Sequence, residues 1–204
     1  MEKHKMIKKG LLILLCLPMI GYGQQTNQIK IVKNAANIQF SDYLEKIPLG
    51  QEEMFGFNDR EDFNRVKIGI PYEVFTLKSD FFDDENIKRN KNYIISTGHF
   101  RVPIIVDNEY RVLLTVSNLN KTYDIVKIGG KGLAKELAVF RKNHPSINTP
   151  NILRVFQLKG DFILTSDTTI YPLDSASNDP LIDKKMYTIN ELLVLMKIKF
   201  NYEK

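Results

Sequence analysis

Three β-rich segments separated by two short polar turns occupy the middle of the chain, and they constrain the fold more than any other feature. The segments are Asn92–Val106, Tyr110–Val116 and Thr122–Ile128. The turns between them, Asp107–Glu109 and Asn118–Lys121, are too short to connect anything but antiparallel neighbours. The sequence therefore predicts a three-strand antiparallel meander.

Further strands are expected on both sides of this meander. The segment Val66–Leu77 is rich in β-forming residues, and Pro71 within it indicates an edge position or a bulge. Downstream, the apolar segments Ile152–Leu158 and Phe162–Leu173 flank the turn Lys159–Asp161. This arrangement predicts a hairpin, which brings the expected sheet to about five to seven strands.

Two helices are expected to pack on this sheet. In the first, apolar side chains recur at helical spacing along one face, namely Leu133, Leu137 and Phe140. The second begins with the pattern of a capping box, Thr188 and Glu191. We therefore expect a single α+β domain: an antiparallel sheet, meander plus hairpin, with both helices covering one face. This order of elements is loosely similar to that of cystatin-like domains, a similarity of architecture alone.

The N-terminus has the three parts of a secretory signal peptide. Four lysines precede an apolar run, Leu11–Ile20, and the small residues around Tyr22 favour cleavage near Gly23. A retained membrane anchor is the alternative, but the apolar run is about half of the roughly 20 residues that cross a bilayer. A lipoprotein signal ending at Cys16 is disfavoured by the bulky Leu15. We expect residues 1–23 to be the signal peptide, 24–48 an N-terminal arm or first strand, and 49–204 the domain.

Signal cleavage would change the charge and the chemistry of the chain. Residues 1–23 contribute +3 of the formal net charge of +5, and they contain the only cysteine, Cys16. A nearly neutral mature chain gives no electrostatic indication of nucleic-acid binding. Without a cysteine, the mature chain has no disulfide and no thiol nucleophile, and no transmembrane segment is expected after cleavage.

The glycine-rich segment before the first helix raises the question of phosphate binding. Gly129, Gly130 and Gly132 surround Lys131, directly after a β-rich segment. The P-loop pattern is absent because Leu133 follows the last glycine, and the dinucleotide pattern is absent because its third glycine is missing. We expect the glycines to let a strand turn tightly into a packed helix.

Histidine chemistry has one candidate centre. His99 follows Ser96 and Thr97, which are possible nucleophiles, but no nucleophile-elbow or Ser-x-x-Lys signature surrounds them. The remaining histidine of the mature chain, His144, comes just after a helix end, where a cation suits the helix dipole. Neither histidine has the neighbours that a zinc site needs. We predict no catalytic residue, and the alternative is a hydrolase centred near His99.

Two further groups contain residue types that occur in binding sites. An acidic cluster resembles calcium ligands in type but lacks the EF-hand spacing and glycine: Asp80, Asp83, Asp84 and Glu85. Lysines and an arginine follow it directly, so a charge-balanced loop is the favoured interpretation. Several aromatic residues on the expected strands could line a groove, but core and cross-strand packing is the simpler explanation for most of them: Tyr72, Phe75, Phe81, Phe82, Tyr93, Phe100 and Tyr110. We expect no metal and no cofactor.

These features favour an exported, non-catalytic protein of the periplasm or the extracellular medium. Such a protein would bind a peptide, a protein or a cell-envelope component through a sheet face or an exposed edge strand. The sequence does not identify the ligand.

Overall fold

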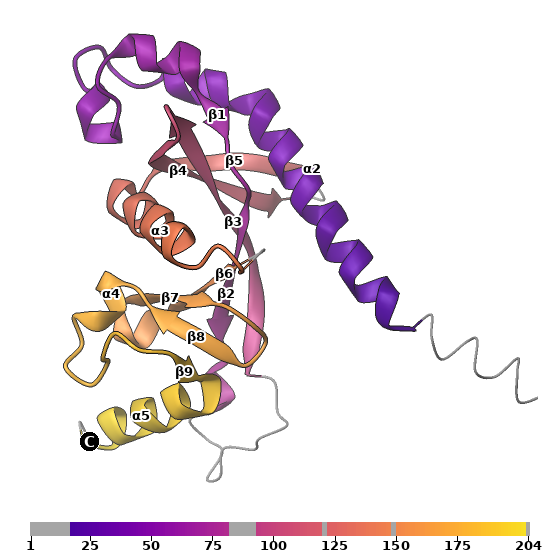
Figure 1. Cartoon of the computed structure of the whole chain (residues 1–204), viewed down its shortest axis with the longest axis vertical. Helices are drawn as coiled ribbons and strands as arrows, with labels where there is room; N and C mark the ends of the chain where they lie inside the picture. Colours follow the sequence, from indigo (N-terminus) through magenta and orange to yellow (C-terminus); the bar gives the residue numbers. More distant parts are fainter. Residues whose placement is uncertain (1–16, 82–92, 120–121, 148–149, 203–204) are drawn as a thin grey trace, which may run out of the picture.

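The computed structural model describes residues 17–81, 93–119, 122–147 and 150–202. Figure 1 shows the arrangement of the helices and strands along the chain. In chain order the elements are α2 (Leu17–Glu45), η1 (Glu52–Phe55), η2 (Arg60–Arg65), β1 (Lys67–Ile68), β2 (Tyr72–Leu77), η3 (Ser79–Phe81), β3 (Ile94–Val106), β4 (Glu109–Leu119), β5 (Thr122–Gly129), α3 (Lys131–Asn143), β6 (Asn151–Val155), η4 (Phe156–Leu158), β7 (Gly160–Leu164), β8 (Thr169–Pro172), α4 (Asp174–Ser177), β9 (Tyr187–Thr188) and α5 (Ile189–Tyr202).

One sheet runs through the molecule, in the order β5-β4-β3-β2-β6-β7-β8-β9, with β1 paired to β3. The α+β class, the meander β3-β4-β5 and the hairpin β6-β7 are confirmed. The strand number is nine among the described residues rather than five to seven, because β1 and β9 are two-residue strands. The sheet is also mixed, since β2 and β6 pair in parallel. The meander and α3 separate these two strands in the chain, and this long connection permits parallel pairing.

The prediction that both helices cover one face of the sheet is wrong. Helix α3 packs with Leu113 and Ile163 on one face, whereas α5 packs with Leu153 and Phe162 on the other. Because side chains alternate between the faces of a strand, the consecutive apolar residues of β6 and β7 supply both layers. Helix α2 covers the β3-β4-β5 end of the same face as α5.

Residues 24–48 were expected to form an arm or a first strand, but most of this segment belongs to the helix α2. Val32, Ala36 and Leu44 are buried, and their spacing of four and eight residues places them on one helical face. The intervening polar residues weaken this helical pattern in the sequence. The expected cleavage site at Gly23 lies within α2. The structure does not test cleavage, which stays a prediction. Within the described part of the chain, no helix has the length and apolarity to span a membrane.

Side chains of α2 occupy the free edge of β5. The Gln39 amide donates to the carbonyl oxygen of Tyr123 and accepts from the N–H of Ile125, both at 3.0 Å. The Tyr43 hydroxyl donates to the carbonyl oxygen of Ile125. These bonds replace those that another strand would make, and they protect this part of the edge from strand addition.

Both predicted helix starts are present. Gly130, at a φ of 78°, is the N-cap of α3, and its carbonyl oxygen accepts from the N–H of Ala134 at 2.9 Å. The glycine segment therefore does turn β5 into α3. The capping box of α5 is also confirmed: Glu191 accepts from the N–H of Thr188 at 2.6 Å, and the Thr188 hydroxyl accepts from the N–H of Glu191 at 3.2 Å.

A buried carboxylate attaches the last turns of α5 to the loop after α4. Lys199 donates to the Oδ2 atom of Asp179, and the N–H of Leu181 donates to Oδ1 at 3.1 Å. Desolvation alone would raise the pKa of Asp179, but the hydrogen bonds and charge of Lys199, together with the Leu181 N–H, lower it below its ordinary value of 3.8. Asp179 therefore stabilises the fold in its ionised form.

We expect Asp179→Asn to lower the free energy of unfolding by about 1–2 kcal/mol at pH 7, because the bond from Lys199 loses its ionic acceptor. The wild-type contribution is complete above the unfolded pKa and is lost as the pH falls through the lower folded value. Urea unfolding at pH 7 and at pH 2.5 measures the effect, and the difference between the two proteins should shrink at pH 2.5. An equal difference at both pH values would contradict this account.

Candidate functional site

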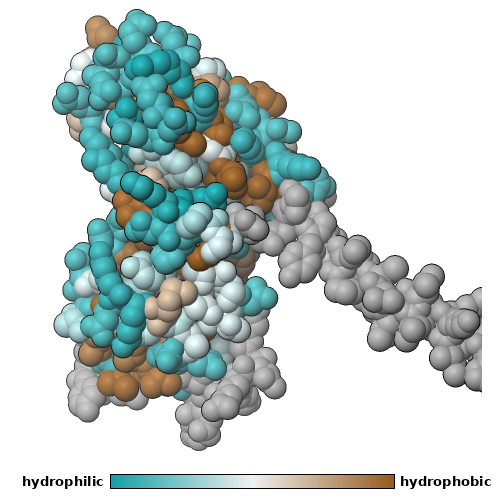
Figure 2. Space-filling model, viewed as in Figure 1, coloured by the Kyte–Doolittle hydropathy of each residue, from teal (hydrophilic) through white to brown (hydrophobic). Residues whose placement is uncertain are grey.

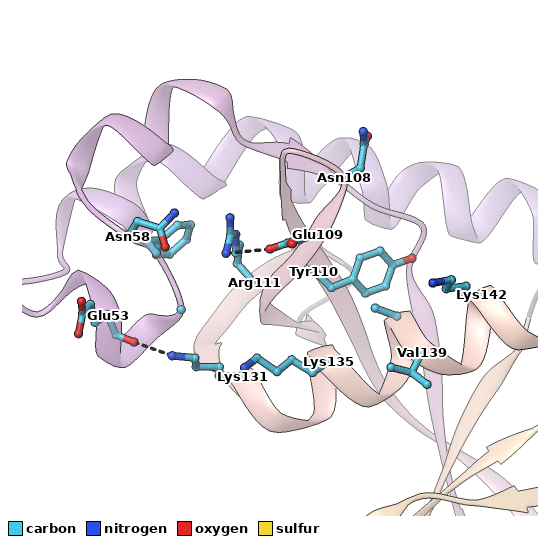
Figure 3. Close-up of a pocket in the computed structure, with 13 residues that line it drawn as sticks. Glu53, Asn58, Asn108, Glu109, Tyr110, Arg111, Lys131, Lys135, Val139 and Lys142 are labelled. Atoms are coloured by element: carbon cyan, nitrogen blue, oxygen red, sulfur yellow. Dashed lines mark hydrogen bonds and ion pairs between the residues drawn. The ribbon is translucent and has the colours of Figure 1, made fainter.

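A cleft of about 990 Å³ lies between α3, the loop after η1 and the turn that joins β3 to β4 (Figure 3). Its first wall is the exposed face of α3, from Lys131 to Lys142. The opposite wall consists of Glu53 and residues 56–58, and residues 108–111 complete the lining. The surface over α3 is mostly hydrophilic (Figure 2).

Gly56 fixes the loop wall of the cleft. Its φ is 88°, in the left-handed region, and a Cβ atom built on it would lie 2.6 Å from the carbonyl oxygen of Arg111. Only glycine allows the loop to approach β4 this closely. The next residue, Phe57, is buried and packs edge-on against Phe63, with ring centroids 4.9 Å apart. This side of the cleft is therefore preformed by packing.

The β3-β4 turn positions the residues at the base of the cleft. Asp107 and Asn108 have φ values of 50° and 66°, so this is the tight type of hairpin turn that accepts Asp and Asn at both central positions. The expected turn at Asp107–Glu109 is confirmed. It places Glu109, Tyr110 and Arg111 at the start of β4, beside α3.

Cations dominate the charged lining of the cleft. Lys131, Lys135 and Lys142 come from α3, and Arg111 comes from β4, against the carboxylates of Glu53 and Glu109. Lys131 donates to the carbonyl oxygen of Glu53 at 3.0 Å, across the two walls. The cleft therefore has an excess of two positive charges among its described residues, which favours an anionic ligand.

Arg111 is the least exposed of these cations, with 17% of its side chain accessible. One terminal nitrogen, Nη1, lies 3.0 Å from the Oε2 atom of Glu109. The Nε atom is buried and has no hydrogen-bond acceptor among the described residues. A ligand oxygen would therefore meet the accessible part of the guanidinium, which has more N–H donors than the contact with Glu109 uses.

A second polar cluster lies on the α3 face of the sheet, and its members bond to one another. Arg154 donates to Asp161 at 2.6 Å, and Arg101 donates to the Thr115 hydroxyl. Burial raises the pKa of Asp161, against the opposing effect of the Arg154 and Arg101 charges. Burial also lowers the pKa of Arg101, and the charge of Asp161 opposes that change. Its hydrogen bonds join β3 to β4 and β6 to β7, so we assign it to stability.

The structure does not assemble a hydrolase centre around His99. The Ser96 hydroxyl donates to Glu73 at 2.6 Å, and the Thr97 hydroxyl donates to the carbonyl oxygen of Val74 at 2.7 Å. The ring of His99 is exposed, and among the described residues no hydroxyl or carboxylate is hydrogen-bonded to it. The nucleophile, base and orienting carboxylate of a triad are thus not brought together.

The other residues that the sequence suggested as candidates pack in the structure, line the cleft or lie outside the described residues. His144 stacks on Phe140 at the end of α3, with ring centroids 4.5 Å apart. The acidic cluster from Asp83 onward lies outside the described residues, and within the described ranges no group of three His, Cys, Asp or Glu could hold a metal ion. Phe82 lies outside the described residues; most of the other expected aromatic residues are buried in the core, whereas Tyr110 lines the cleft.

Sequence reasoning missed the cleft itself. The signal that could have found part of it is the spacing of Lys131, Lys135 and Lys142, which places three cations on one face of a helix. Arg111 gives no comparable signal, because its role depends on the loop around Gly56.

Comparison with protein families, with curated proteins and with solved structures finds no match to this chain.

Proposed function

We propose that this chain is an exported, non-catalytic protein that binds a peptide or a protein, and that the cleft beside α3 is its binding surface. The observation that supports this proposal is a preformed open cleft of about 990 Å³ with an excess of positive charge. Large clefts with a few convergent polar groups are the usual places for ligands. The export part of the proposal depends on the N-terminal leader pattern.

The cleft is favoured over the sheet edge as the binding surface. At β5, the edge groups of Tyr123 and Ile125 are already bonded to α2, so an added strand would have to displace Gln39 and Tyr43. On the cleft wall, Lys135 and Lys142 are exposed and need no such displacement. The hydrolase alternative gains no support from the geometry at His99.

Site-specific photocrosslinking in cells of the source organism tests this proposal. A photoreactive amino acid is placed at Val139, which is 59% exposed on the cleft wall, and in a second protein at Val126, which is 45% exposed on β5. We expect a protein adduct of defined mass from position 139 and none from position 126. Adducts only from position 126, or turnover of an ester or peptide substrate that is lost in His99→Ala, would overturn the proposal.

A further inference from the structure

We propose that the occupant of the cleft is an acidic peptide segment in extended conformation, whose carboxylates bind to Arg111 and to the lysines of α3. This inference rests on the proposed function and adds the chemistry of the ligand.

The lysines form a stripe that matches an extended chain. Lys135 and Lys142 follow Lys131 by four and eleven residues, which keeps all three within a narrow sector of the helix surface. At 1.5 Å per residue, the stripe is about 16 Å long. An extended peptide advances about 3.3 Å per residue, so about five residues cover the stripe. Acidic residues at alternate positions of such a peptide would all point toward α3.

Two of these lysines have no ion-pair partner in the described part of the chain. Lys135 and Lys142 are exposed, and no ion pair to either is present among the described residues. Arg111 has one ion pair among the described residues, to Glu109, and part of its side chain stays accessible. A ligand carboxylate can bind a guanidinium through two oxygens, which is the arrangement that arginine prefers.

The uncharged lining favours a peptide over a sugar polymer. Asn58 and Asn108 carry amides that both donate and accept, as peptide groups require, and Val139 provides an apolar contact between Lys135 and Lys142. Sugars bind on exposed aromatic rings, but in the described lining Phe57 is buried and Tyr110 is partly buried.

A smaller depression lies beside the cleft, on the other side of Lys135 and Val139. Its volume is about 290 Å³, and it shares those two residues with the cleft and extends toward His144 and Tyr171. Its lining includes the carboxylates of Glu136 and Asp174, so an acidic chain is expected to stay in the cleft, on the lysine side of α3.

Fluorescence anisotropy with defined peptides tests the inference. The probe is a labelled eight-residue peptide that alternates Glu and Val, and the matched peptide has Gln in place of Glu. We expect the acidic peptide to bind at least about tenfold more tightly at low salt and to lose most of this advantage at high salt. The double variant Lys135→Gln/Lys142→Gln should weaken binding of the acidic peptide about five- to tenfold.

A matched variant separates local contacts from net charge. Lys30→Gln/Lys67→Gln removes the same charge from exposed positions outside the cleft, on α2 and β1, and should change binding less than about twofold. Equal weakening of acidic-peptide binding in both double variants would overturn the inference. It would also be overturned if an oligogalacturonate or a short single-stranded DNA bound as tightly as the acidic peptide, or more tightly.

The inference and the proposed function fail in different ways. If the acidic and Gln peptides bind equally, or neither binds, while position 139 still crosslinks to a protein, the acidic chemistry is wrong and the proposed function stands. If position 139 gives no adduct either, both are wrong.

Discussion

Gly56→Ala is expected to lower the free energy of unfolding by about 3 kcal/mol. Two costs add at this position. An alanine at a φ of 88° is strained by about 1–2 kcal/mol, and its Cβ atom would lie 2.6 Å from the carbonyl oxygen of Arg111. That oxygen belongs to the backbone of a central strand and cannot move aside cheaply, so the loop has to shift, at a further cost of about 1–3 kcal/mol. Urea unfolding followed by circular dichroism measures the change.

Gly50 provides a matched control for this prediction. It has a similar φ of 81°, but a Cβ atom built on it meets nothing within 4 Å. Gly50→Ala therefore carries the conformational strain without the clash, and should cost about 1–2 kcal/mol. Equal losses in the two variants would show that the loop does not press on β4 as described.

The parts of the fold that local patterns determine could be predicted from the sequence. The meander follows from alternating strands around the turn at Asp107–Glu109, and the start of α5 follows from Thr188 and Glu191. In both, the residues that decide the structure are near neighbours in the chain. In these two segments the local pattern and the observed structure agree, because tertiary contacts add little to the local conformational preference.

Long-range packing explains what was predicted wrongly. The neighbouring residues Ile152 and Leu153 are both apolar, which fits a strand buried on two faces, but nothing local says which helix covers which face. In α2, the buried residues are sparse among polar ones, so their helical period is weak. The helix is stabilised by docking on the sheet, which the sequence of this segment does not reveal.

The candidate site could be predicted only in fragments. Its walls come from Glu53, from residues 56–58 and 108–111 and from α3, which meet only after the meander and α3 have formed. The three lysines share a helical face in the sequence, but an exposed face with lysines is ordinary. What turns it into a cleft is the opposite wall, which depends on the close approach of Gly56 to β4.

Asp161→Ala is expected to lower the free energy of unfolding by about 2–3 kcal/mol. The carboxylate is 10% exposed and is bonded to Arg154 at 2.6 Å, and its charge also stabilises the protonated form of Arg101. Removing it leaves two partly buried guanidiniums without their counter-ion. Breaking a fully buried pair costs about 3–5 kcal/mol. The value here is smaller because 38% of the Arg154 side chain is exposed and screened by water.

A double-mutant cycle with Arg154→Met separates this ion pair from the loss of packing. If the pair contributes as described, the double variant should be more stable than the sum of the single changes predicts, by about 1–2 kcal/mol. Arg101 keeps its bond to the Thr115 hydroxyl in all four proteins, so the cycle isolates the contact between β6 and β7. Strict additivity would mean that Arg154 and Asp161 are independent, and the cluster would then have to be reconsidered as part of a binding surface on the sheet.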